Sequence, residues 1–301
     1  MNRSLLKILE TNKLSKNYGK LQALRDLDLR VEEGMVFGFL GPNGSGKTTT
    51  LALLLQVLQP TLGSFSWFGL DQQVNVRKKI GAILESPCFY PYMTGYQNLA
   101  VASRIKEVEL SAIDPVLKLV DLFERKDDLF KTYSLGMKQR LAIASALLAD
   151  PRVLILDEPT NGLDPQGIVE IRNLIRRIAA SGKTIILASH LLDEVQKVCT
   201  HFLVLRKGEK LYQGSVQEAL SDQTRIELGA SDLESLNRVV SQFSGISQIE
   251  QKDGRLLIRA PGITTEQINA YLIEKGFVLN HLEEKKGNLE EQFLRILSDH
   301  A

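Results

Sequence analysis

The chain has 301 residues, 44% of them hydrophobic, which is enough for one large domain with its own core and a smaller appended one. Its 37 basic and 36 acidic residues give a formal charge of +1, so no global charge bias points to nucleic acid or acidic lipid. Two cysteines, Cys88 and Cys199, are too few for a disulfide framework and fit a reducing compartment.

No stretch of the sequence predicts a membrane span. The longest apolar stretches, 51–58 and 141–149, are well short of the roughly 18 residues that a spanning helix needs. The first residues mix charges with short apolar pieces and lack the pattern of a secretory signal. We therefore expect any membrane role to be exerted through a partner.

The first two thirds of the chain alternate between strand-like and helical patterns. Strands are predicted at 14–18, 24–31, 35–40 and 80–84, with a helix at 49–57. The segment 96–148 is helical, most clearly at 110–122 and 137–148. Short apolar runs at 153–156 and 184–188 predict buried parallel strands, separated by a helix that Pro165 opens. A hairpin is predicted at 201–214, turning near Lys207-Gly208. This alternation predicts an α/β fold with a mostly parallel sheet covered on both faces.

Beyond about residue 222 the pattern predicts a compact α+β extension, 222–301, appended to a first domain at 1–221. A strand at 225–228 precedes a helix at 231–243, which we expect Ser231 to cap with Glu234 three positions on. A hairpin turns at 252–254, and a second helix begins at Thr264 with Gln267 in a capping box and stops at Gly276. A last strand and a helix at 288–297 complete the extension.

A glycine-rich loop carries the strongest chemical signal. It fits G-x-x-x-x-G-K-[ST] at every fixed position, and it comprises Gly41, Pro42, Asn43, Gly44, Ser45, Gly46, Lys47 and Thr48. A predicted strand precedes it and a predicted helix, beginning at Thr49, follows it, which is the context in which such a loop binds phosphate. Lys47 is expected to reach the β- and γ-phosphates of ATP, and Thr48 to ligate Mg²⁺.

Two carboxylates follow the apolar run 153–156, and a histidine follows 184–188. Because ligands of open α/β sheets bind at the carboxyl ends of the strands, Asp157 is expected to hold Mg²⁺ and Glu158 to polarise a water for attack on the γ-phosphate. His190 is placed to hydrogen-bond the γ-phosphate and the attacking water, although taken alone it fits a capping or core histidine as well.

The run Ser134-Leu135-Gly136-Met137-Lys138-Gln139-Arg140 resembles the signature loop of ABC-type ATPases. Other marks of this family follow in order over residues 7–218: Tyr18 at the position that stacks on adenine, Glu85 at the Q-loop position, Asn161-Gly162-Leu163-Asp164 as the D-loop and His190 as the switch histidine. The resemblance implies a P-loop core with an N-terminal antiparallel sheet and a helical subdomain at about 86–148.

The resemblance also implies a dimer that sandwiches two ATP molecules. Ser134 and Gly136 would offer donors to the γ-phosphate of the ATP held by the other subunit, and Asp164 would communicate between the two sites. Leu135 and Met137 depart from the commoner signature, which predicts altered packing with binding retained. Glu85 replaces the usual glutamine as a metal ligand, and its added charge is expected to tighten Mg²⁺ binding or to shift the pH dependence.

The leading functional prediction is the ATP-binding subunit of an ABC transporter, cytoplasmic and peripheral on the inner face of the membrane, with integral permease subunits as partners. The run from Glu85 to Gly95 resembles the branch of drug, lantibiotic and bacitracin-type exporters. The aromatic residues at 89, 90, 92 and 96 fit a surface that docks on the permease, or simply cover the helical subdomain.

Two other functions stay open at this point: an ABC-type ATPase acting on nucleic acid or ribosomes, and one working mechanically on a membrane complex without transport. The single cassette and balanced charge make a nucleic-acid partner unexpected. A homodimer is favoured because both half-sites look competent, and a heterodimer stays open. The extension at 222–301 fits a dimerisation or regulatory role and a stabilising cap equally.

Overall fold

The computed structural model describes residues 6–71, 76, 79–84, 88–221, 225–260, 262–285, 287 and 289–299. The chain divides into two compact units, Met1–Gln213 and Gly214–Ala301. The division lies eight residues before the sequence-predicted boundary at 221/222.

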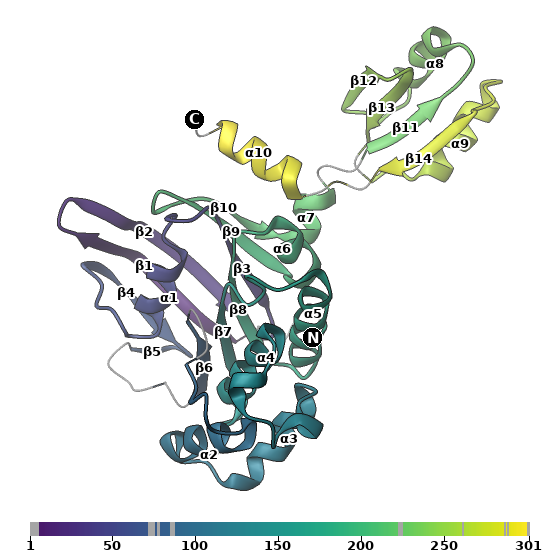
Figure 1. Ribbon diagram of the computed structural model, residues 1–301. Coiled ribbons are helices and arrows are strands. Elements are labelled where there is room, and N and C mark those ends of the chain that lie inside the picture. Colours follow the sequence, from purple (N-terminus) through teal and green to yellow (C-terminus); the bar gives the residue numbers. More distant parts are fainter. Residues whose placement is uncertain are drawn as a thin grey trace. The chain divides into compact units, whose positions relative to one another are not determined.

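A six-stranded, mostly parallel sheet forms the centre of the first unit (Figure 1). Its strand order is β10-β9-β3-β8-β7-β6, and β9, β3, β8, β7 and β6 are parallel neighbours. The strands are β3 (Val36–Leu40), β6 (Ile80–Ile83), β7 (Val153–Asp157), β8 (Thr184–Ser189), β9 (His201–Arg206) and β10 (Glu209–Ser215). Every residue of β3, β7 and β8 is buried, which confirms the prediction of buried parallel strands from the two apolar runs.

A second sheet is antiparallel, with the order β2-β1-β4-β5. It comprises β1 (Lys7–Tyr18), β2 (Leu21–Glu32), β4 (Leu62–Trp67) and β5 (Leu70–Asp71). Helix α1 (Lys47–Leu54) lies between the two sheets and contacts β2 and β7. One core joins all three layers, including Leu27 of β2, Leu51 of α1 and Ile155 of β7. This packing holds the loop between β3 and α1 at the carboxyl edge of the central sheet.

The helical part contains α2 (Gly95–Lys106), α3 (Ile113–Leu119) and α4 (Leu135–Leu147), with short 3₁₀ turns at Leu110–Ala112, Phe123–Arg125 and Phe130–Thr132. The predicted single helix at 110–122 is wrong at both ends. Pro115 lacks an N–H and is tolerated only in the first turn, so the α-helix begins at Ile113. After its last turn, Asp121 adopts a left-handed conformation with φ 56°.

Two other predicted helices have different ends in the structure. The helix predicted at 49–57 spans Lys47–Leu54, because it starts within the phosphate loop and Gln56 turns left-handed with φ 57°. The helix predicted at 137–148 spans Leu135–Leu147, since the Ser134 side chain accepts from the Met137 N–H at 3.2 Å and caps it. Helices α5 (Pro165–Ala180) and α6 (Leu192–Val198) complete the unit; α6 packs against β3 and β8.

The second unit contains a β-α-β-β-α-β arrangement with strand order β12-β13-β11-β14. Its elements are α7 (Val216–Ser221), β11 (Arg225–Gly229), α8 (Leu233–Val240), β12 (Gln248–Lys252), β13 (Arg255–Arg259), α9 (Thr265–Glu274), β14 (His281–Lys285) and α10 (Leu289–Asp299). Leu236 of α8 and Leu272 of α9 pack with Ile226, Leu228 and Ile258 of the sheet in one core. Both helices therefore cover the same sheet face.

The helix caps of this unit agree with the sequence prediction at one helix and differ at the other. Thr264 and Gln267 form the expected capping box at the start of α9. The predicted capping box of Ser231 and Glu234 is wrong. Instead, Asp232 caps α8, and its carboxylate accepts from the Ser235 N–H at 3.0 Å. Asp and Ser are nearly equal as caps, so the choice between adjacent residues depends on where the preceding strand ends.

Candidate functional site

The phosphate loop connects β3 to α1, and its glycines are sterically required. Gly44 and Gly46 have φ values of 76° and 107°, which side chains disfavour. A Cβ on Gly46 would lie 2.6 Å from the Ala23 carbonyl oxygen, and one on Gly41 would lie 2.3 Å from that of Leu205. Ser45 is buried, and its Oγ has no hydrogen-bond partner among the described residues. These features fit a loop whose backbone wraps an anion.

Lys47, the first residue of α1, is buried and turned back over the loop. Its Nζ donates to the Gly41 carbonyl at 2.7 Å and to that of Pro42 at 3.3 Å. The same atom lies 3.3 Å from Oε1 of Glu158. This ammonium group is therefore held at the point where the loop and the end of β7 meet, where it can contact a phosphate.

Thr48 and Asp157, which the sequence predicts as Mg²⁺ ligands, lie in contact in the structure. The Thr48 hydroxyl donates to Oδ2 of Asp157 at 2.8 Å, and Asp157 is 4% exposed at the end of β7. A hydroxyl and a carboxylate oxygen are ligands that Mg²⁺ prefers. The donor set therefore fits Mg²⁺. Glu85, predicted as a further ligand, lies outside the described residues.

Glu158 joins the phosphate loop to the loop after β8. His190 Nδ1 donates to Glu158 Oε2 at 2.8 Å, while Glu158 Oε1 faces Lys47. Glu158 has a positive φ of 48°, and its N–H donates to the Ala188 carbonyl at 3.0 Å. A non-glycine residue held in this conformation costs of order 1 kcal/mol or more and needs support from its surroundings. The strained backbone aims this carboxylate across the end of the sheet.

The loop lines a cavity of about 530 Å³. Tyr18, which is 46% exposed, lines this cavity together with the first residues of β2. The other lining residues are Leu21, Gln22, Ala23, Asn43, Gly44, Ser45, Gly46, Lys47, Thr48, Thr49, Glu158 and Lys207. An aromatic side chain and a phosphate-binding loop thus face one space, as a nucleotide requires.

Sequence reasoning missed Lys207 as a cavity residue. It identified the Lys207-Gly208 turn, but nothing local shows that this turn packs on the phosphate loop. The Gly208 N–H donates to the Ser45 carbonyl at 2.9 Å, and a Cβ on Gly208 would lie 3.0 Å from Ala23. The sequence signal was the Lys207-Gly208 pair, in which Lys207 has φ 50° in the structure. The contact of Gly208 could not be predicted, because its partner Ser45 lies about 160 residues earlier in the chain.

The signature and D-loop residues line a different groove, of about 470 Å³. Its lining includes Ser134, Gly136 and Asp164, and it shares no residue with the nucleotide cavity. Asp164 caps α5, with Oδ1 accepting from the Gly167 N–H at 2.9 Å. The signature substitution Leu135 packs on the D-loop, since a Cβ on Gly162 would lie 3.3 Å from its Cδ2. Within one copy, the two halves of the predicted site are separate.

Two of the other cavities among the described residues have the largest volumes. One, of about 730 Å³, lies on β1, β2 and β4 and contains none of the predicted nucleotide residues. The other, a groove of about 720 Å³, runs along α2 and is lined by Phe89, Tyr90, Val101, Ile105 and Lys106 with Cys88, Asn98, Ala102 and Ser145. Burial lowers the pKa of the Lys106 ammonium.

The predicted aromatic surface is only partly exposed. Tyr90 and Tyr92 are 48% and 67% exposed, with ring centroids 5.8 Å apart. Phe89 is half-buried on Phe130, and Tyr96 lies under the Lys126 ammonium. Hence two of the four rings support the helical part, and the other two face outward.

Comparison with known proteins identifies the family. Residues 24–161 match the model of the ABC transporter family. The bacitracin transport ATP-binding protein BcrA of Enterococcus faecalis is 33% identical over 296 residues, which cover 96% of each chain. The chain belongs to the ABC transporter family, as an ATP-binding protein. The lantibiotic transport ATP-binding protein SrtF of Streptococcus pyogenes is 38% identical over 73% of this chain and 99% of its own.

The fold comparison agrees with the sequence comparison. CbiO1 of Clostridium perfringens, part of the ABC transporter complex cbiONQ, superposes with a TM-score of 0.66 at 28% identity and covers 79% of this chain and 96% of its own. The predicted α/β P-loop fold and the predicted family are therefore confirmed. This ABC protein binds ATP and is an ATPase that drives transport. The alternative, an ABC-type ATPase that works without transport on a membrane complex or on a nucleic-acid or ribosome target, is not favoured. Among the helices that the structure describes, none is long and apolar enough to span a bilayer.

Proposed function

We propose that this ABC ATPase exports a peptide antibiotic, as a dimer that closes around two ATP molecules and Mg²⁺. The observation that carries the proposal is the meeting of Lys47 and Glu158 at the nucleotide cavity, with His190 hydrogen-bonded to Glu158 from the loop after β8. Bound Mg²⁺ would neutralise phosphate charge, and Thr48 and Asp157 would hold it. Glu158 is the general base that orients the attacking water, and His190 fixes the direction of its carboxylate.

The separation of the two grooves supports the dimer. Ser134 and Gly136 do not line the cavity of their own copy, so they meet a γ-phosphate only when a second copy brings them to it. Their position at the start of α4 presents backbone N–H groups and the positive end of a helix. Asp164 lines the same groove and would face the partner's site.

The cargo class is inferred from the relatives. The names of BcrA and SrtF assign them to bacitracin and lantibiotic transport, and the match to BcrA extends through the second unit. A test compares antibiotic resistance in the natural host lacking this chain, with wild type or Glu158→Gln restored. Resistance to bacitracin-like or lantibiotic peptides restored only by wild type supports export. Unchanged resistance to both classes contradicts the proposed cargo.

The proposed permease contact is the groove along α2. Ile105 is 78% exposed and Tyr90 48% exposed, and both line this groove as apolar surface that a helix of a membrane subunit can cover. Cys88 is exposed in the same groove and gives a built-in probe. Alkylation of Cys88 should slow several-fold when the chain is assembled with its permease in membranes. An unchanged rate in the purified complex would place the contact elsewhere.

The nucleotide assignment is tested on the purified chain. Lys47→Ala should abolish Mg²⁺-dependent ATP hydrolysis and weaken ATP binding, because it removes the ammonium beside the phosphate loop. Lys210→Ala, an exposed lysine outside the cavity lining, is the matched control. Thr48→Val keeps the side-chain shape and should raise the Mg²⁺ concentration needed for activity. Equal Mg²⁺ dependence in Thr48→Val and wild type would exclude Thr48 as a ligand.

A further inference from the structure

Helices α5 and α6 each follow a loop that carries a residue of the proposed site. Asp164 immediately precedes α5, and His190 lies two residues before α6. The loop between β8 and α6, residues 190–191, is the switch loop. It is short, and the Leu191 N–H donates to the Ser189 hydroxyl at 3.0 Å. The position of His190 therefore follows the position of the first turn of α6.

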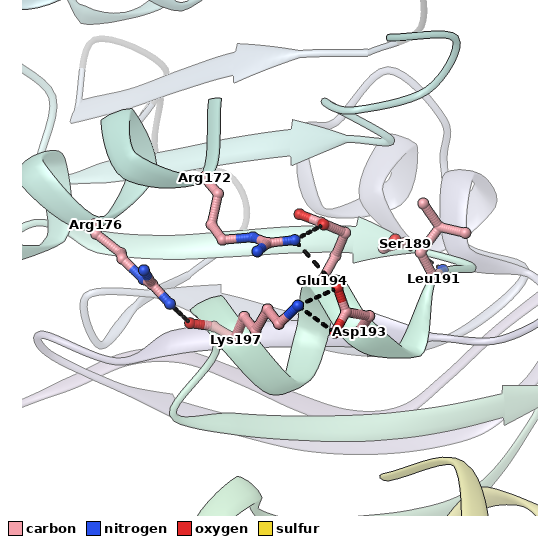
Figure 2. Close-up of polar contacts among 7 residues, drawn as sticks. All are labelled: Arg172, Arg176, Ser189, Leu191, Asp193, Glu194 and Lys197. Carbon is pink, nitrogen blue, oxygen red and sulfur yellow. Dashed lines mark hydrogen bonds and ion pairs between the residues drawn. The ribbon is translucent and has the colours of Figure 1, made fainter. Parts of the chain in front are cut away.

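Two arginines of α5 hold both ends of α6, as Figure 2 shows. Arg172 Nη2 donates to Oε1 of Glu194 and lies 3.2 Å from Oδ2 of Asp193, both in the first turn of α6. Arg176 Nη2 donates to the Lys197 carbonyl at 2.6 Å, in the last turn. The Arg172–Glu194 pair is buried, with 11% and 6% of the two side chains exposed.

A helix as short as α6 has little stability of its own and takes its position from its contacts. On its apolar side, Val195 and Cys199 pack on β3 so closely that a Cβ on Gly38 would lie 3.0 Å from each. On its polar side, Arg172 sets its position relative to α5. The guanidinium is planar with donors in fixed directions, so two carboxylates bound to it are also fixed in direction.

We propose that Arg172 is a positioning residue for ATP hydrolysis, which holds His190 at hydrogen-bond distance from Glu158 by fixing the first turn of α6 to α5. Glu194 follows His190 by four residues, and His190 Nδ1 lies 2.8 Å from Glu158 Oε2. The inference rests on the proposed roles of Glu158 and His190. Arg172 itself lines neither the nucleotide cavity nor the groove that contains Ser134, Gly136 and Asp164.

The test measures kcat, KM for ATP and Tm of Arg172→Lys in the full chain. Lysine keeps the positive charge and spares Glu194 from being left as an unpaired buried charge, but it cannot reproduce the planar fork. We expect kcat to fall about tenfold or more, since small misplacements of catalytic groups have effects up to about 100-fold. KM should change by less than about twofold, because neither Arg172 nor Glu194 is among the described residues that line the nucleotide cavity.

Arg177→Lys is the matched control, because Arg177 lies on the same helix and pairs with Asp121 at 2.6 Å in an exposed ion pair. A double variant, Arg172→Met with Glu194→Leu, removes both charges and should keep a Tm close to that of wild type. It should lose kcat like Arg172→Lys. If both Arg172 variants keep kcat within about twofold of the Arg177 control, the proposal is wrong.

The decisive comparison is made in a His190→Ala background. If Arg172 acts through His190, Arg172→Lys lowers kcat there no further, whereas a general structural effect lowers it by the same factor as in wild type. An equal additional loss would overturn the proposal. A different result would contradict the proposed roles of His190 and Glu158: ATP hydrolysis at the wild-type rate by the single variants His190→Ala and Glu158→Gln.

Discussion

At the scale of single residues, Glu158 is the point where the proposed chemistry converges. One of its carboxylate oxygens faces the Lys47 ammonium, and the other accepts from His190. The left-handed backbone conformation of Glu158 ends the extended chain of β7. The Glu158 N–H then bonds to the Ala188 carbonyl near the end of β8. The two contacts orient the carboxylate, which supports the role of general base that we propose for Glu158.

Glu158→Gln should lower the rate of ATP hydrolysis by roughly 10²- to 10⁴-fold, the usual contribution of a general base. The amide keeps the size of the side chain, so ATP affinity should stay within about tenfold of wild type. Phosphate release and binding of a fluorescent ATP analogue measure the two quantities. Hydrolysis at more than about half the wild-type rate would exclude Glu158 as the base.

The two cysteines should differ sharply in reactivity. Burial raises the pKa of the Cys199 thiol, and the nearby Glu194 carboxylate raises it further. Because the thiolate is the reactive form, native Cys199 should resist iodoacetamide at pH 8, while the exposed Cys88 reacts. Mass spectrometry should show one adduct on the native chain and two after denaturation. Two adducts formed at similar rates on the native chain would contradict the burial of Cys199.

At the scale of elements, α5 connects segments that are far apart in sequence. Its N-terminus carries Asp164, Glu170 lies 3.7 Å from Arg140 of α4, and Arg172 pairs with Glu194 of α6. Polar groups on one helix thus reach the helices that follow both the signature loop and the switch loop. We infer that α5 sets the mutual position of these loops.

Sequence patterns predicted the elements whose cause is local. The buried runs of β7 and β8, the proline that opens α5 and the capping box at Thr264 needed no tertiary information. Strand β4 was missed because its apolar pattern is weak and its partner β1 lies about 50 residues earlier. Lys207 at the cavity and the Arg172 contacts were missed for the same reason, since each depends on packing between distant segments.

The second unit should lose stability in acid through Glu227 of β11. A hydrogen bond from Lys285, and then one from Arg255, hold the pKa of this carboxyl below its usual value of 4.5. A lowered folded-state pKa contributes stability above about pH 4.5, and this contribution is lost as the pH falls through the folded-state value. The stabilising contacts link β11 to β14 and β13.

Glu227→Gln should therefore lower Tm near pH 7, and the difference from wild type should shrink as the pH falls below about 4.5. Calorimetry across pH 3–7 measures it. Glu250→Gln is the control, because Glu250 is about half exposed and lies 3.7 Å from Arg225. A Glu227→Gln difference that is constant with pH would show that the carboxylate charge contributes nothing.

At the scale of the whole molecule, one copy of the chain contains what we propose are two incomplete halves of a nucleotide site. The phosphate loop, Tyr18 and Glu158 line one cavity, while Ser134, Gly136 and Asp164 line another groove. The first half lies at the ends of the buried strands β3 and β7, and the second lies on α4 and α5, which are capped by Ser134 and Asp164. The simplest arrangement that completes them is a pair of copies related by a twofold axis, with two ATP molecules between them.

Size-exclusion chromatography of Glu158→Gln, with and without ATP and Mg²⁺ and beside wild type, tests whether two copies share the ATP sites. We expect a dimer only in the variant and only with ATP, because bound ATP joins the two copies and the variant does not hydrolyse it. Adding Ser134→Arg to Glu158→Gln should restore the monomer, since it blocks the signature groove. A variant that binds ATP and stays monomeric at micromolar concentration would contradict the shared site.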